Sequence, residues 1–149
     1  MRGFTLFALA VGMAGAACAH DKHFDAGEPA AANAAGQVIN VTMTDGDGKM
    51  AYTPDRIEVK KGAVVKFVLK NAGSTKHEFV IGSHAENLDH KRMMEAMPDM
   101  RHDDPNVKSL EPGTSTTLAW RFTNAGEFEF DCLLPGHYEA GMHGVVIVK

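Results

Sequence analysis

Residues 131–149 read DCLLPGHYEAGMHGVVIVK and are the most informative part of the chain. Within them Cys132, His137 and Met142 follow one another at five-residue steps, between two runs that have the pattern of β-strands. Thiolate, imidazole and thioether are soft donors, and soft donors select copper over magnesium or calcium. A His2Cys copper site with an axial Met needs a second imidazole. We expect His77, in the run KHEFV, to supply it.

Each of these residues also has an ordinary alternative role. A single Cys is most often a small buried hydrophobic side chain, a lone His a surface residue, and a lone Met a filler of the core. The order Cys-x4-His-x4-Met between two strands, with a histidine after an upstream β-run, favours a shared metal site over three separate explanations. We find no set of side chains that predicts an enzyme.

The first 19 residues have the features of a secretory signal peptide. Arg2 precedes an apolar run over 4–17, and Ala17-Cys18-Ala19 forms a cleavage site. No other segment approaches the roughly 20 apolar residues of a membrane span. We therefore expect a periplasmic protein in which Cys132 is the remaining cysteine. A lipid anchor on Cys18 is the less favoured alternative, because the Leu usual three positions before such a cysteine is missing.

Length and composition predict one globular domain after this leader. The chain has 149 residues, of which 44% are hydrophobic and 23% charged, and its net charge of −4 gives no basic footprint for nucleic acid. Residues 20–37 are rich in Ala, Gly and charge, and predict a flexible arm that carries histidines. Residues 38–149 predict a monomeric β-sandwich with short strands at 38–44, 56–60, 63–69, 77–81, 107–110, 114–122, 127–131 and 144–149. An insertion is expected over about 83–105, in which residues 83–97 predict a helix that ends at Pro98.

This pattern resembles the cupredoxins, whose all-β Greek-key sandwich carries one copper ion. The resemblance covers about residues 38–149 and is carried by the runs IEVKKG (57–62), FVLKN (67–71) and KHEF (76–79), together with the terminal loop. It implies a type 1 copper site whose ligands are His77, Cys132, His137 and Met142. More narrowly, the run FDCLLPGHYEAGM (130–142) is similar to exported bacterial cupredoxins of copper tolerance, which carry a His/Met-rich insertion and a His-bearing arm.

Two further copper sites are hypotheses with strong alternatives. In the insertion, His90, Met94, Met97, Met100 and His102 offer thioethers and imidazoles for a labile second copper ion. Methionines at helical spacing also form core-facing stripes, and some of these must pack against the sandwich. In the arm, His20 and His23 offer a chelate for copper capture, or belong to a solvated tail.

The sequence leaves two functional hypotheses open and disfavours a third. The first is a copper-binding protein that sequesters copper or passes it to a transfer partner, and so limits copper toxicity. The second is an electron carrier that exchanges one electron with a redox partner. An oxidase of Cu(I) is disfavoured, because such enzymes use several copper ions and this chain has one cysteine in its predicted domain.

Overall fold

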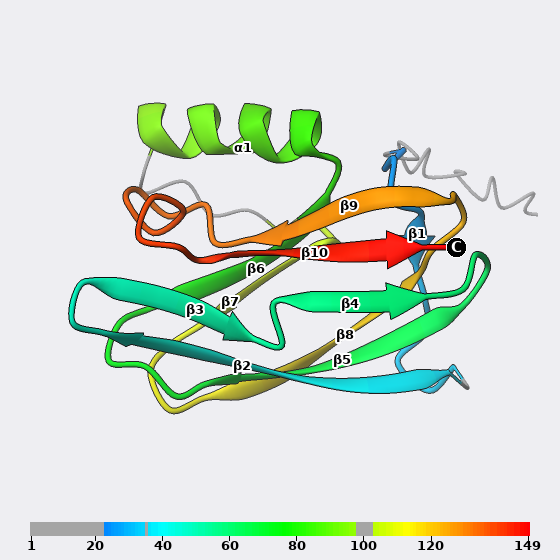
Figure 1. Cartoon of the computed structure of the whole chain (residues 1–149), viewed down its shortest axis with the longest axis horizontal. Coiled ribbons are helices and arrows are strands. Elements are labelled where there is room, and N and C mark those ends of the chain that lie inside the picture. The colour runs from blue at the N-terminus through cyan, green and yellow to red at the C-terminus, as the bar shows by residue number, and fades with distance from the viewer. Residues whose placement is uncertain (1–22, 35, 98–102) are drawn as a thin grey trace, which may run out of the picture.

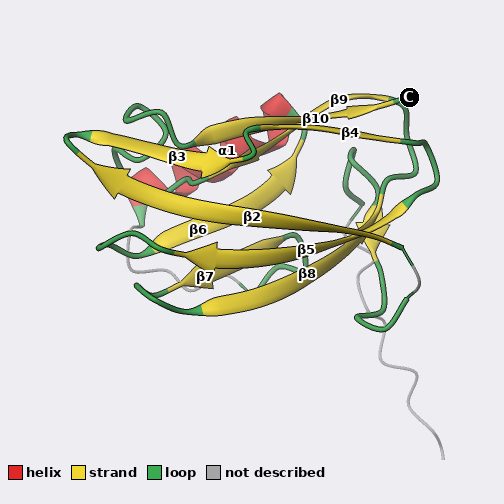
Figure 2. Cartoon of the chain, turned by 60° about the horizontal axis from the view of Figure 1, so that its bottom comes forward, coloured by secondary structure: helices red, strands yellow, loops and turns green. Residues whose placement is uncertain are grey.

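The computed structural model describes residues 23–34, 36–97 and 103–149, and places ten strands in two sheets of five. The first sheet has the order β1-β8-β5-β2-β3 and the second the order β4-β10-β9-β6-β7. Along the chain the strands are β1 (Glu28–Pro29), β2 (Gln37–Gly46), β3 (Lys49–Thr53), β4 (Arg56–Val59), β5 (Val64–Asn71), β6 (His77–Gly82), β7 (Val107–Leu110), β8 (Ser115–Arg121), β9 (Gly126–Asp131) and β10 (His143–Val148). Figures 1 and 2 show the layers that these strands form. The expected β-sandwich is confirmed.

Both sheets mix parallel and antiparallel pairs. Strand β2 pairs in parallel with β5, and β4 in parallel with β10, whereas the other neighbouring strands of the two sheets pair antiparallel. The two parallel pairs join strands that are not connected by a hairpin, because parallel neighbours need a crossover. The last strand, β10, therefore lies inside the second sheet, between β4 and β9.

Alternating side chains of the two sheets form the core. Phe67 of β5, Phe79 of β6 and Phe130 of β9 are fully buried, and Tyr52 of β3 packs edge-on against Phe79 and Phe130. The rings of Phe79 and Phe130 are stacked, with centroids 5.1 Å apart. Since side chains two residues apart share a face of a strand, this aromatic cluster fixes which faces of β6 and β9 turn inward.

The insertion forms one helix, α1 (His84–Ala96), which packs on β6 and β9 of the second sheet (Figure 1). Ser83 is its N-cap: the backbone N–H of Glu86 donates to the Ser83 hydroxyl, and the Glu86 carboxylate accepts from the Ser83 backbone N–H. This capping box satisfies two backbone donors at the start of the helix. The helix predicted from the sequence is confirmed. All six residues of β6 are buried, because α1 packs on this strand while Phe79 and Ile81 belong to the main core.

Two features of the fold have no clear signal in the sequence. Strand β3 follows the turn at Asp47 and Gly48, where both residues have positive φ. Its KMAYT sequence is too short and polar to stand out, and its pairing with β2 supplies the stability. The flexibility expected of the arm does not extend to residues 24–29, because Phe24 is buried edge-on against Trp120 and β1 pairs with β8. Residues 1–22, with the predicted signal peptide and Cys18, lie outside the described part.

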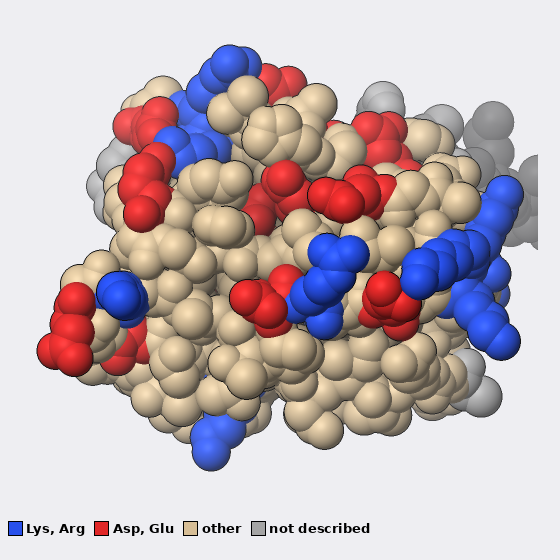
Figure 3. Space-filling model, in the orientation of Figure 1, with Lys and Arg blue, Asp and Glu red and all other residues tan. Residues whose placement is uncertain are grey.

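Acidic and basic side chains are interspersed over the face formed by β9, β10 and β4 (Figure 3). Lys149, for example, pairs with Glu58 of β4 at 2.7 Å. Exposed pairs of this kind contribute little to stability, because water and salt screen them. Within the described ranges, none of the helical segments has the length and apolar content to cross a membrane.

Asn71 ties the end of β5 to the segment that leads into β6, and its loss should destabilise the fold. Its buried side chain donates to the backbone oxygens of Thr75 (2.8 Å) and Leu110 (3.0 Å), and accepts from the N–H of Gly73 (2.9 Å). Removal leaves buried backbone groups without these partners, so Asn71→Ala should lower the free energy of unfolding by about 2 to 4 kcal/mol. Urea unfolding followed by circular dichroism measures this.

Asn40 provides the matched control, because it lies exposed on the neighbouring strand β2. Asn40→Ala should change the free energy of unfolding by no more than about 0.5 kcal/mol. Equal losses in the two variants would contradict a special role for Asn71.

Candidate metal centre

The four predicted ligands come from the ends of three neighbouring strands and the loop between two of them. His77 is the first residue of β6, Cys132 directly follows β9, and Met142 directly precedes β10. Strands β10, β9 and β6 lie side by side in the second sheet, and His137 belongs to the loop that joins β9 to β10. The order of the strands in the sheet therefore brings together His77 and Cys132, which are 55 positions apart in the sequence.

Three donor atoms converge at this corner. The Nδ1 atom of His137 lies 3.3 Å from Sγ of Cys132 and 3.2 Å from Nδ1 of His77. Within the described residues, these three side chains form the single group of three His, Cys, Asp or Glu whose ligand atoms all lie within 4.8 Å of one another. His77 and Cys132 are fully buried and His137 is half-buried. The donor set, two imidazoles and a thiol, fits copper, as the sequence analysis expects.

Met142 is tied to the same corner through its backbone. Its N–H donates to the carbonyl of His137, and its carbonyl accepts from the N–H of Cys132, both at 3.1 Å. The side chain is fully buried within the main core cluster. Gly136 has a φ of +84° in the turn before His137, a conformation that favours glycine. Hydrogen bonds inside the loop therefore hold its length and path.

Cys132 is a buried thiol that faces a backbone donor. The N–H of Glu78 points at its Sγ from 3.2 Å, whereas the Glu78 carboxylate accepts from the Ser109 hydroxyl. Burial raises the pKa of the Cys132 thiol to about 12, against the lowering effect of the Glu78 N–H. Without a metal the sulfur is therefore protonated at neutral pH, and metal binding must displace that proton.

Asp45 orients His77, a role that the sequence analysis did not predict. Its Oδ2 lies 2.8 Å from Nε2 of His77, the ring nitrogen opposite to Nδ1. Ser74 and Thr75 each donate a backbone N–H and a hydroxyl to this carboxylate. The bonds from Ser74 above all hold the pKa of Asp45 well below its usual value, so it accepts the Nε2 proton of His77 and leaves Nδ1 free to bind a metal.

The approach of Asp45 to His77 depends on a glycine between them. A side chain at Gly73 would place its Cβ 2.2 Å from Oδ2 of Asp45 and 3.0 Å from Nε2 of His77. The sequence gives Asp45 the appearance of an ordinary turn residue in DGDG (45–48). Only the pairing of β2 with β5, which brings Asp45 next to the segment before β6, reveals its partner.

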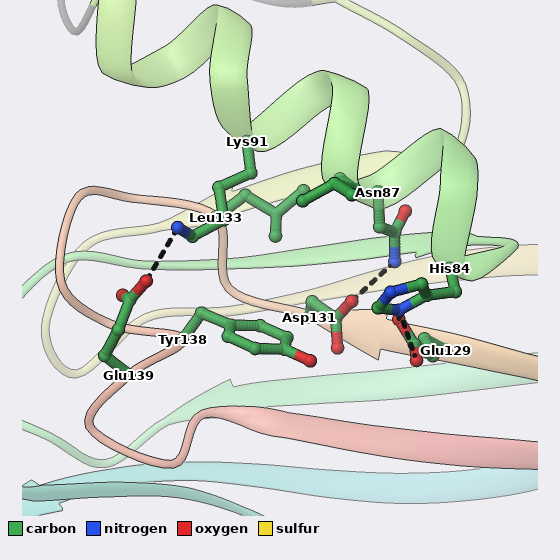
Figure 4. Close-up of a pocket in the computed structure, with 9 residues that line it drawn as sticks. His84, Asn87, Lys91, Glu129, Asp131, Leu133, Tyr138 and Glu139 are labelled. Atoms are coloured by element: carbon green, nitrogen blue, oxygen red, sulfur yellow. Dashed lines mark hydrogen bonds and ion pairs between the residues drawn. The ribbon is translucent and has the colours of Figure 1, made fainter.

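The insertion helix is fastened to the strand and loop that carry the candidate ligands (Figure 4). Asn87 donates to the buried carboxyl of Asp131 at 2.7 Å, one residue before Cys132. Lys91 pairs with Glu139 of the loop at 2.6 Å. Between these contacts lies a small cavity of about 120 Å3, which Leu133 and Tyr138 also line. Helix α1 thus supports one side of the ligand loop.

The residues predicted for the other two sites are only partly brought together. Met94 is 2% exposed and fills the core-facing role that the sequence left open, whereas Met97 is 45% exposed. His90 is half-buried and lines a different cavity, together with the arm residue His23. His20, Met100 and His102 lie outside the described residues.

The raised pKa of Cys132 predicts a direct measurement on the metal-free protein. Ultraviolet titration should show thiolate absorbance only near pH 12, because burial disfavours the charged form. Cys132→Ser provides the blank, because its change in absorbance at high pH comes from tyrosine ionisation without the Cys132 thiolate. Thiolate that forms near the ordinary thiol value of 9.0 would contradict a dry, enclosed sulfur.

Comparison with known proteins identifies relatives of this chain. The model of the cupredoxin-like domain matches residues 6–148. A copper-resistant cuproprotein, CopI, of Rubrivivax gelatinosus is 44% identical over 131 residues, which are 88% of this chain and 78% of that protein. Auracyanin B has the same fold, with a TM-score of 0.65 at 22% identity, over 83% of this chain and 96% of its own.

The likeness in fold extends to larger proteins. A multicopper oxidase shares it with a TM-score of 0.54 at 18% identity, and the match covers 76% of this chain but 44% of the oxidase. These likenesses at low identity concern the fold alone, whereas the family model spans nearly the whole sequence. The chain belongs to the cupredoxin-like family.

Proposed function

We propose that this protein binds one copper ion at a type 1 site made by His77, Cys132 and His137, with Met142 as the axial ligand, and that it contributes to copper tolerance. The convergence of two imidazole nitrogens and one sulfur within 4.8 Å is the observation that carries the proposal. The identity of the donors supports copper, because thiolate with imidazole is the set of such sites.

The chain's own residues explain how such a site would work. Bound copper would supply a one-electron Cu(II)/Cu(I) couple and a visible thiolate charge-transfer band. Cys132 must lose its proton, and the Glu78 N–H then donates to the resulting thiolate. Asp45 keeps His77 in one tautomer, and the hydrogen-bonded loop holds His137 near Cys132. Because His77, Cys132 and Met142 are buried, little water reaches the donors.

Copper tolerance is favoured over other roles by the similarity of this chain to a copper-resistant cuproprotein. The Rubrivivax protein that is 44% identical is a copper-resistant cuproprotein, and we extend that role to this chain. The apolar run at residues 4–17 supports export to the periplasm, where such a protein would meet excess copper. We propose that it acts as a monomer. We also propose that it is not an enzyme, since one Cys-containing site offers no cluster of several copper ions.

Electron transfer is the second candidate. It is supported by His137, which is half-buried and so gives the site an opening toward a redox partner. A rigid donor set also suits rapid electron exchange, because it needs little rearrangement. The two roles differ in what the cell loses with the protein: copper tolerance in the first, turnover of a partner oxidoreductase in the second.

Complementation of a deletion strain tests the proposed function. Wild-type protein should restore growth in copper, and Cys132→Ser should not, because it lacks the thiolate ligand. The purified variant should also lack the visible absorption of the copper-loaded protein. His143→Asn is the matched control, since His143 is exposed beside Met142 and is not a proposed ligand. Normal copper tolerance in the deletion strain, with impaired respiration, would contradict the role in tolerance and favour electron transfer.

Asp45→Asn tests the orienting contact on His77. The amide keeps the size of the side chain but loses the charge, so copper affinity should fall by about 10- to 100-fold. Competition with a chelator of known affinity measures this. Asp47→Asn is the control: Asp47 is exposed in the neighbouring turn with a φ of 51°, which Asn tolerates. An unchanged copper affinity in Asp45→Asn would contradict the orienting role and leave Asp45 only the role of holding residues 73–75 in place.

A further inference from the structure

A second cavity lined by metal-binding side chains lies between α1, the N-terminal segment and residues 104–106. Its volume is about 240 Å3. Glu86, Asp89, His90 and Met93 line it from α1, at the spacing i, i+3, i+4 and i+7 that places side chains on one face of a helix. Asp104 and Asn106 line it from the segment before β7, and His23 from the arm. The proposed type 1 ligands are not among its lining residues.

Specific contacts hold the arm against the helix at this cavity. The backbone N–H of Asp25 donates to the Glu86 carboxylate at 3.0 Å, and the Ser83 hydroxyl donates to the Asp25 carboxylate at 2.8 Å. The next residue after His23, Phe24, is buried in the core against Trp120. His23 is therefore placed beside α1 by its neighbours, although 67 positions separate it from His90.

The donors at this cavity are suited to Cu(I). His23 and His90 supply imidazoles and Met93 supplies a thioether. These donors are softer than the oxygen donors that hard cations prefer. Glu86, Asp89 and Asp104 place three carboxylates around them, which attract a cation. His23 is exposed and Met93 is 40% exposed, so an ion can reach both from solvent.

We infer that this cavity is a second copper site, in which His23, His90 and Met93 bind one Cu(I) ion. It combines residues of the arm and the helix that the sequence analysis assigned to separate sites, and it replaces the buried Met94 by Met93. The inference deepens the proposed function, since a site open to solvent can take up or pass on copper.

The second site should bind more weakly than the first. Within the described residues, only His77, Cys132 and His137 form a group of His, Cys, Asp or Glu drawn within 4.8 Å. The side chains at the cavity must therefore be ordered by the metal, and this ordering costs part of the binding free energy. Weak, exchangeable binding agrees with a role in copper transfer.

Anaerobic titration of the exported chain with Cu(I), against a chromophoric chelator, tests the inference. The wild type should bind two equivalents, the second more weakly. His90→Gln and Met93→Leu should each weaken the second equivalent by at least about 10-fold, since even outer-shell partners of a metal have effects of that size. His84→Gln and Met97→Leu are the matched controls, because His84 begins α1, Met97 is its C-cap, and neither residue lines this cavity. Both controls should keep two equivalents.

The Cys132→Ser background separates this inference from the proposed function. In that variant the stronger equivalent should be lost or weakened, while the cavity still binds Cu(I) and shifts the methyl resonance of Met93 but not that of Met97. Adding His90→Gln should remove the remaining equivalent. A wild-type protein that binds one equivalent, or a second equivalent that survives both His90→Gln and Met93→Leu, would overturn the second site and leave the first untouched.

Discussion

The register between β6 and β9 is the constraint on which the rest of the site depends. Val80 pairs with Asp131, and this alignment leaves the Glu78 N–H facing the Cys132 sulfur at 3.2 Å. A slip of one residue would turn every side chain of β6 to the opposite face. The buried rings of Phe79 and Phe130, which are stacked two residues from His77 and Cys132, resist such a slip. The core packing that fixes the register therefore also fixes the positions of the donor atoms.

Support around this register comes from both sides of the second sheet. On one side Asp45, held by Ser74 and Thr75, fixes the His77 ring. On the other side α1 contacts Asp131 and Glu139, which flank the loop. The two supports come from segments distant in sequence, so the donor group is held by the sandwich as a whole. Such support suits a site that must hold its geometry through a change of oxidation state.

The sequence alone was enough to predict the sandwich, the helix and the residues that meet at the centre. Cys132, His137 and Met142 lie on one short loop, and the run around His77 has a clear β-pattern, so local spacing carries the information. The contact of Asp45 with His77 and the cavity that His23 and His90 both line were beyond such reasoning. Each depends on contacts between segments tens of residues apart, and neither has a spacing that marks it. The burial of Phe24 was missed for the same reason, because its partner Trp120 is distant in sequence.

The central claim is that His77, His137 and Cys132 together hold a single copper ion. X-ray absorption at the copper edge, on protein loaded with one equivalent of copper, tests this most directly. We expect a first shell of two imidazole nitrogens and one short sulfur contact, because the three donors already converge within 4.8 Å. A first shell of nitrogen and oxygen alone, without the sulfur, would contradict it.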